Sequence, residues 1–230
     1  MPLLLVMWHL KMSILMVSIY SKSLKDIFSF EVIWFVLQVT LLSLISSISI
    51  IWYFWAELSS FIEGYLSWIP WEWLQSSGAT LLTYLLSYMI FLISLSTFTS
   101  LLSEKLLLKL AKKHYPNMKA KGNPNTFTSL AITAKSSILS LGLFILFIPL
   151  FFIPIVGQIL IVYVWAIMLQ KPSVYDVGAI FIADKKTLNE KKKKTTLLSM
   201  IASLLNYLPI LNTFAPVFAQ ILFLHHILEE

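Results

Sequence analysis

Long apolar stretches dominate the pattern of this chain, and the first two predict helices that cross a membrane. Val32–Trp55 and Ser77–Leu102 contain no charged residue. Each exceeds the roughly 20 apolar residues that a helix needs to cross a bilayer. Hydrophobic residues make up 58% of the chain and its mean hydropathy is +0.83, which is far above the values of soluble domains. We therefore predict an all-α integral membrane protein, with residues 1–230 forming a single membrane domain.

The third apolar stretch, residues 136–169, predicts a helical hairpin that enters the membrane partway and returns. Pro149, Pro154 and Gly157 interrupt its middle, where proline removes a backbone donor and clashes with the preceding turn. The arms on either side have about 13 to 15 residues, or roughly 20 to 22 Å of helix, against a hydrocarbon core of about 30 Å. Neither arm is long enough to cross, so we predict a re-entrant hairpin.

The fourth stretch, residues 195–228, repeats this pattern, with the segment Pro209–Pro216 as its break. The turn sequences Phe152–Gly157 and Tyr207–Asn212 share one order: aromatic, aliphatic, Pro, Ile, aliphatic, then a residue that tolerates positive φ. Unwound backbone survives inside a membrane only when it is buried in protein or lines a water-filled cavity. A repeat of broken apolar segments is therefore a pointer to a transport site.

The lysines predict on which side of the membrane each segment lies. The chain has 17 lysines and no arginine: three lysines precede the first stretch, none lies between the first and second, seven follow the second and seven follow the third. Because lysine-rich loops stay in the cytoplasm, we predict cytoplasmic loops at 103–135 and 170–194 and cytoplasmic termini. Residues 56–76 hold three glutamates, no lysine and several Trp and Tyr residues, which predicts an outside loop on the membrane surface.

Residues 1–31 predict an N-terminal interfacial helix, because His9 and Lys11 interrupt their apolar run. The run lacks a basic start and a small-residue cleavage site, so a signal peptide is not predicted. An additional span over residues 2–20 stays open as the alternative.

Composition argues against an enzyme, a cofactor or a metal site. The chain has no cysteine, no acidic residue in the first three apolar stretches and none of the common hydrolase, metalloprotease or phosphate-loop motifs. His225 and His226 are adjacent, so on a helix they diverge and do not share a metal ion. The net charge of +6 is explained by topology and anionic lipid headgroups, without nucleic acid.

The same turn sequences carry a resemblance to a known family. Ile148-Pro149 through Gly157, the segment Leu208–Val217 and, more weakly, Ser23–Ser29 resemble the CysZ family of bacterial sulfate permeases and their etoposide-induced-protein relatives. The resemblance spans about residues 20–228. It implies two full spans with two half-penetrating hairpins, a homo-oligomer in the bacterial inner membrane, and passive uptake of sulfate for cysteine synthesis.

The resemblance also implies an anion site ahead of the first span. The family's sulfate-binding element is a Gly-Leu-Arg-like segment, and this chain has Ser23-Leu24-Lys25 at that position. Lysine binds sulfate as a point charge, with less geometric selection than the bidentate guanidinium of arginine. The alternative interpretation of Lys25 is an ordinary cytoplasmic lysine that orients the first span.

Further candidates lie at the hairpins. Lys135 stands at the mouth of the first hairpin, where it either meets an anion or extends to the headgroups. Amides inside apolar stretches could donate hydrogen bonds to a dehydrated anion, or could bond between helices or cap the breaks; Asn212 is predicted to be a cap. The predicted pore and turn residues are Lys135, Pro149, Pro154, Gly157, Gln158, Asn206, Pro209, Asn212, Pro216 and Gln220.

Two functions from different classes remain at this point. The first is a passive anion channel or permease, with sulfate as the expected substrate. The second is a non-transporting membrane organiser, whose hairpins wedge one leaflet and whose lysines hold anionic lipid and a protein partner.

Overall fold

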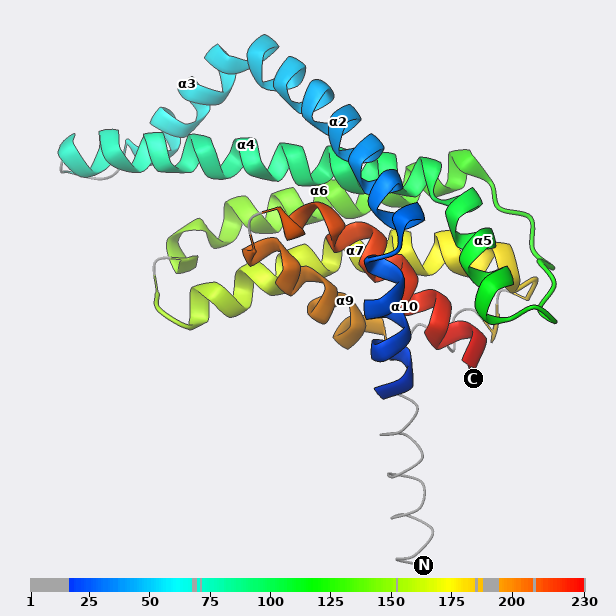
Figure 1. Cartoon of the computed structure of the whole chain (residues 1–230). Helices are drawn as coiled ribbons and strands as arrows, with labels where there is room; N and C mark the ends of the chain where they lie inside the picture. Colours follow the sequence, from blue (N-terminus) through cyan, green and yellow to red (C-terminus); the bar gives the residue numbers. More distant parts are fainter. Residues whose placement is uncertain are drawn as a thin grey trace, which may run out of the picture.

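The computed structural model of the chain describes residues 17–67, 70, 72–151, 153–184, 186–187, 195–208 and 210–229, and every regular element in these ranges is a helix (Figure 1). The all-helical prediction is confirmed. Residues 1–16 of the predicted interfacial helix lie outside the described residues, and residues 17–27 are helical. The remaining elements are α2 (Phe30–Tyr53), α3 (Trp55–Leu66), α4 (Glu72–Leu102), α5 (Glu104–His114), α6 (Thr126–Phe151), α7 (Val156–Phe181), α9 (Thr195–Ser203), two 3₁₀ helices (Leu204–Tyr207 and Leu211–Phe214) and α10 (Ala215–Glu229).

Within the described ranges, four helical segments are long and apolar enough to cross a membrane: Phe30–Tyr53, Gln75–Leu102, Thr126–Phe151 and Leu211–Glu229. The first two correspond to the predicted spans. The other two belong to the predicted hairpins. This part of the chain is therefore a multi-pass membrane protein.

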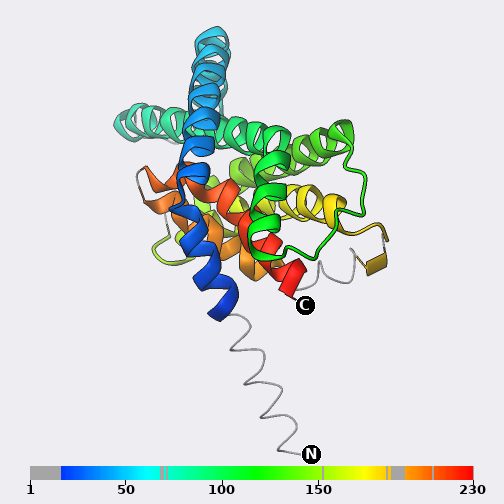
Figure 2. The same cartoon turned by 45° about the vertical axis from the view of Figure 1, so that its right-hand side comes forward.

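Helix α2 has the character of a helix that contacts lipid. Val32, Val36 and Val39 are buried against the bundle, where α2 packs on α4. Most of its exposed side chains, such as Leu41 and Ile48, are also apolar. A helix that is apolar both inside and outside needs an apolar environment on its outer face. Figure 2 shows that α2 projects away from the hairpins, and Figure 1 shows that α3 returns from its far end toward the start of α4.

The segments predicted to be loops are largely helical. The outside segment 56–76 contains most of α3 and the start of α4, and α3 packs along α4. On the other side, the predicted cytoplasmic loop 103–135 contains α5 and the first ten residues of α6, and α7 continues to Phe181 inside the predicted loop 170–194.

The first hairpin has longer arms than the sequence predicts. Helices α6 and α7 have 26 residues each, which is about 39 Å of helix and long enough to cross a bilayer. The predicted arm length is wrong because both helices continue through charged residues, past Lys135 in α6 and past Lys171 and Asp176 in α7. The charge-free stretches that adjoin the tip are residues 136–151 and 156–170.

The second hairpin holds the most deeply buried helix of the bundle. Its first arm runs through α9 and the 3₁₀ helix Leu204–Tyr207, and its second arm is dominated by α10, where every residue from Ala215 to Leu228 is buried. The chain break is shorter than predicted. Pro216 lies in the first turn of α10, where proline is tolerated, and Pro209 lies outside the described residues.

The two turns adopt one backbone conformation at equivalent positions. Ile155 has φ 68° and ψ −55°, and Ile210 has φ 71° and ψ −47°. In the first turn the Val156 N–H donates to the Pro154 carbonyl at 2.8 Å, which closes a γ-turn. The internal repeat is thus present in the fold, but the positive φ falls on the isoleucine after each proline. Gly157 and Asn212, the turn residues that tolerate positive φ, do not adopt it.

Gly157 is needed for close packing across the turn. A Cβ atom at this position would lie 2.4 Å from the carbonyl oxygen of Phe151. Pro149, in contrast, does not end α6, since the helix continues for two more residues.

Both hairpin tips meet α4 along its length. Near the first tip, Ile148 is buried with Leu82 and Leu86 of α4. At the second tip, the Tyr88 hydroxyl of α4 donates to the Asn206 carbonyl at 3.1 Å. Since α4 begins at Glu72, it continues about 15 Å beyond Leu82 at 1.5 Å per residue.

Replacement of Gly157 by alanine should destabilise the hairpin by about 1–3 kcal/mol, because the added methyl group overpacks the turn. The matched control is Gly142→Ala in the middle of α6, where a Cβ meets nothing within 4 Å. That change should be neutral or stabilising by about 0.5–1 kcal/mol, since glycine is a poor residue for helix interiors. Thermal unfolding in detergent measures both. An equal effect of the two changes would contradict the packing role of Gly157.

Candidate functional site

The predicted amides Asn206 and Asn212 come together at the second hairpin tip. We call Tyr88, Trp165, Asn206, Tyr207 and Asn212 the hairpin cluster. The Asn212 side chain donates to the Tyr88 hydroxyl at 3.2 Å, and Tyr88 donates to the Asn206 carbonyl. Trp165 of α7 lies edge-on between the rings of Tyr88 and Tyr207, with centroids at 6.3 and 5.1 Å. The Asn212 side chain, which was predicted to be a cap, therefore bonds to a side chain of α4.

The hairpin cluster contains buried hydrogen-bond donors without partners. Asn206 and Trp165 are 7% and 6% exposed. Neither amide atom of the Asn206 side chain nor the indole Nε1 of Trp165 has a hydrogen-bond partner in the described part of the chain. An unsatisfied buried polar group costs about 1–3 kcal/mol. The cluster therefore holds neutral donors that are available to a ligand.

The other two predicted amides lie elsewhere. The Gln158 side chain is exposed, and only its backbone carbonyl joins the second hairpin, by accepting a bond from Tyr207 at 2.9 Å. Gln220 of α10 is buried and donates to the Asp176 carboxylate at 2.9 Å. Lys135 is exposed on α6, which suits a side chain that extends to the headgroups.

Asp176 is a buried acid in the segment predicted to be a cytoplasmic loop. The residue is 7% exposed, because α7 continues past its apolar arm. Ser100 and Ser129 each donate to its carboxylate at 2.6 Å, in addition to Gln220. Side chains from three helices therefore donate to one buried carboxylate. The end of the apolar run of an arm does not mark the end of its helix, so the burial of Asp176 could not be predicted from hydropathy.

The predicted anion motif does not converge on one point. Ser23 is fully buried, with its hydroxyl unpaired among the described residues, whereas Leu24 is 50% exposed and Lys25 is exposed. All three lie in the last turns of the helix over residues 17–27, where residues two apart point in different directions. Lys25 is available to an anion from the solvent side, without the Ser23 side chain.

The next residue, Asp26, holds this helix to the bundle. Its carboxylate lies 2.8 Å from His114 Nε2, 3.0 Å from His225 Nε2 and 3.1 Å from Lys113 Nζ. Burial by itself would raise the pKa of the Asp26 carboxyl, but the hydrogen bonds from His225, His114 and Lys113 outweigh it and lower the pKa to about 2. The carboxylate is thus ionised at neutral pH.

Tyr115 completes the surroundings of Asp26. Its hydroxyl bonds to His225 Nδ1 at 2.9 Å, and burial is the largest cause that raises the Tyr115 pKa. One turn beyond His225, Glu229 pairs with Lys22 and accepts a bond from Ser18. These contacts fix the N-terminal helix to α5 and α10.

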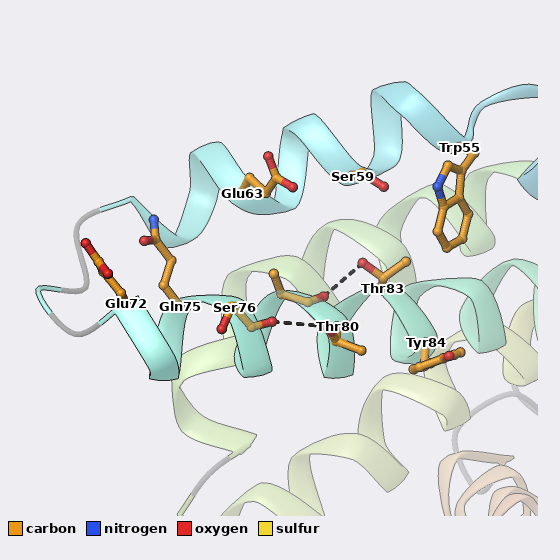
Figure 3. Close-up of a pocket in the computed structure, with 10 residues that line it drawn as sticks. Trp55, Ser59, Glu63, Glu72, Gln75, Ser76, Thr80, Thr83 and Tyr84 are labelled. Carbon is orange, nitrogen blue, oxygen red and sulfur yellow. Dashed lines mark hydrogen bonds between the residues drawn. The ribbon is translucent and has the colours of Figure 1, made fainter.

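A separate pocket opens between α3 and α4, at the end of α4 away from α5 (Figure 3). It has a volume of about 660 Å³ and is lined by hydroxyl, amide and aromatic side chains together with Glu63 and Glu72. Both glutamates lie in the segment that the sequence predicts to face outside. Their charge disfavours an anion at this end.

The apolar helices and the paired hairpins define a multi-pass, all-helical membrane protein. The family model for the sulfate transporter CysZ/Etoposide-induced protein 2.4 matches residues 19–216. The chain therefore belongs to this family of membrane transporters, and the resemblance carried by the turn sequences is confirmed. Neither a curated protein nor a solved structure shows a match to the chain.

Tyr88→Phe should destabilise the protein by about 1–3 kcal/mol, because it leaves the buried Asn206 carbonyl and the Asn212 amide without their shared partner. Tyr84→Phe is the matched control, since Tyr84 lies one turn earlier on α4 and is 70% exposed. Unfolding followed by circular dichroism in detergent measures both variants. If Tyr88→Phe unfolds at the same temperature as the wild type, the hydroxyl does not link the hairpin to α4.

Proposed function

We propose that this chain is a passive permease for a small oxyanion, with sulfate as the first candidate, in the bacterial inner membrane. Membership of the sulfate transporter family supports the class of substrate. The observation that carries the proposal is a pair of donors in the hairpin cluster, the Asn206 amide and the Trp165 indole N–H, which have no partner among the described residues. Neutral donors suit a permeating anion, because they bind it less tightly than a buried cation would and so allow its release.

The depth of the hairpins supports a route through the membrane. We propose that both hairpins are re-entrant, as the sequence predicts, although their helices are longer. The charge-free parts, residues 136–151 and 156–170, measure about 24 and 22 Å at 1.5 Å per residue, less than a core of about 30 Å. The contact of Ile148 with Leu82 and Leu86, well inside α4, fits tips that stop within the membrane.

The distribution of charge fits a cytoplasmic side rich in cations. Helix α5 carries Lys105, Lys109, Lys112 and Lys113. Lys25 is also exposed and precedes the first span, on the side that is predicted to be cytoplasmic. We propose that these lysines contact anionic lipid headgroups and that both termini are cytoplasmic. We also propose a homo-oligomer, as the resemblance to the CysZ family implies.

Uptake of radiolabelled sulfate into liposomes that carry the purified protein should exceed uptake into empty vesicles. Asn206→Leu should lower it about tenfold, as loss of one hydrogen bond worth about 1.4 kcal/mol implies. The control is Gln38→Leu, the same type of change at an exposed amide of α2, and it should leave uptake unchanged. Lys25→Ala tests the anion motif separately.

The outcomes of the uptake experiment separate the two functions. Wild-type uptake equal to that of empty vesicles would overturn the permease and favour the membrane organiser, whose lysines only hold lipid. Uptake that persists in Asn206→Leu would remove the hairpin cluster from the route and leave the permease in place.

Single cysteines test the topology, because the chain has none of its own. In intact cells an impermeant thiol reagent should label Ser60→Cys on α3, but not Ala120→Cys or Asp184→Cys; all three positions are exposed. Val156→Cys, at the first tip and 48% exposed, should stay unlabelled if the hairpin is re-entrant. Labelling of Val156→Cys from outside would show that α6 and α7 cross completely.

A further inference from the structure

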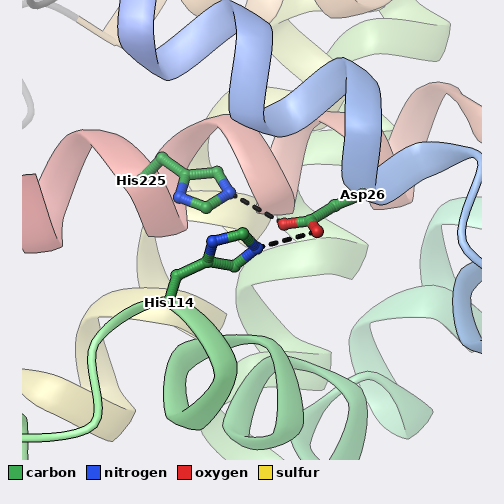
Figure 4. A group of neighbouring side chains, drawn as sticks. All are labelled: Asp26, His114 and His225. Carbon is green, nitrogen blue, oxygen red and sulfur yellow. Dashed lines mark hydrogen bonds and ion pairs between the residues drawn. The ribbon is translucent and has the colours of Figure 1, made fainter.

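Three side chains with metal-binding atoms meet where three helices come together (Figure 4). Asp26 comes from the N-terminal helix, His114 from the end of α5 and His225 from α10. One ligand atom from each residue can be chosen so that all three lie within 4.8 Å of one another. Both histidines direct Nε2 at the carboxylate, at 2.8 and 3.0 Å.

These distances suit one small ion. Zinc binds imidazole nitrogen and carboxylate oxygen at about 2.0–2.2 Å, so two ligand atoms on one tetrahedral ion lie roughly 3.3 Å apart. His114 and His225 contact different oxygens of the Asp26 carboxylate, at 2.8 and 3.0 Å, and the three chosen ligand atoms lie within 4.8 Å of one another. Rotation of the side chains therefore has to close a gap of up to about 1.5 Å for all three to hold one ion. Two imidazoles and one carboxylate are a ligand set of borderline divalent metals, and they disfavour Ca²⁺ and Mg²⁺, which prefer oxygen.

The surroundings are those of a supported site. Asp26 and His225 are fully buried, so their ligand atoms have little freedom to move. The Tyr115 hydroxyl, 2.9 Å from His225 Nδ1, fixes the ring so that Nε2 faces Asp26. Outer partners of this kind orient metal-bound histidines. The His114 side chain is 20% exposed, which leaves a way in for the ion.

One cation competes for the same carboxylate. Lys113 Nζ lies 3.1 Å from Asp26 Oδ1, but its side chain is 55% exposed and can turn to solvent when an ion enters. The other neighbouring charges, Lys22 and Glu229, are paired with each other. Lys113 is therefore expected to oppose metal binding without preventing it.

We propose that Asp26, His114 and His225 form a binding site for a divalent transition metal of the zinc type, which clamps the N-terminal helix to α5 and α10. The three ligands leave one tetrahedral position for water. The site does not depend on transport, because none of its ligands belongs to the hairpin cluster.

The test uses the full-length protein in detergent, first stripped with a chelator and then titrated with Zn²⁺ against a chromophoric competitor. The wild type should bind one Zn²⁺ per chain and melt at a higher temperature with Zn²⁺. Co²⁺ in the same site should give the visible absorption of a tetrahedral ion. His114→Ala and Asp26→Asn should each weaken Zn²⁺ binding at least 100-fold, and Tyr115→Phe about 10-fold as the loss of an outer partner.

Two lysines of α5 provide a test variant and its matched control. Lys113→Gln removes the competing cation and should tighten Zn²⁺ binding. Lys109→Gln removes an exposed lysine that pairs with Glu31 at 3.1 Å and should leave binding unchanged. These two variants retain all three ligands, so they give a result even if Asp26→Asn does not fold.

Either of two results would overturn the proposal. The first is no Zn²⁺ retained by the wild type above the amount in buffer. The second is binding that is the same in His114→Ala as in the wild type, which would place the ion elsewhere.

Discussion

On the re-entrant topology proposed above, the two unwound hairpin tips lie in a membrane interior that offers no water, so their backbone groups need partners within the protein. This constraint accounts for the arrangement around them. The first turn closes on itself through the γ-turn at Ile155, and Gly157 lets the returning helix approach the Phe151 carbonyl. The second turn lies against α4, where Tyr88 bonds to both Asn206 and Asn212. A positive φ at a β-branched residue costs of order 1–3 kcal/mol, and it persists here because the arms on both sides are fixed by packing.

The end of the bundle around Asp26 depends on charge, whereas the hairpins depend on backbone geometry. Asp26 would be costly as a lone buried anion, and three donors from α5 and α10 surround it. The result joins residues far apart in the chain: 199 positions separate Asp26 from His225. Because α10 is buried from Ala215 to Leu228, this contact fixes the N-terminal helix directly to the core of the bundle.

Features that depend on local pattern could be predicted from the sequence, and features that depend on long-range contact could not. The apolar runs gave α2 and α4 within a few residues, and the Pro-Ile repeat gave both turns. The arms were predicted too short, because Lys135 and Asp176 read as loop residues while the helices continue through them. Hydropathy marks where a helix is apolar, whereas backbone hydrogen bonding decides where it ends. No spacing rule could bring Asp26 to His114 and His225, since each lies on a different element.

Asp176 restricts where an anion could pass. Its carboxylate is held by Ser100 of α4 and lies 11 residues beyond Trp165 on α7, which is about 16 Å along the helix. At an effective dielectric constant near 20, a second negative charge at 4 Å costs about 4 kcal/mol, while one at 16 Å costs only about 1 kcal/mol. An anion in the hairpin cluster is therefore compatible with an ionised Asp176, but an anion beside Ser100 is not. A route that starts at the hairpin cluster must leave α4 before Ser100, or else Asp176 must carry a proton when the anion passes.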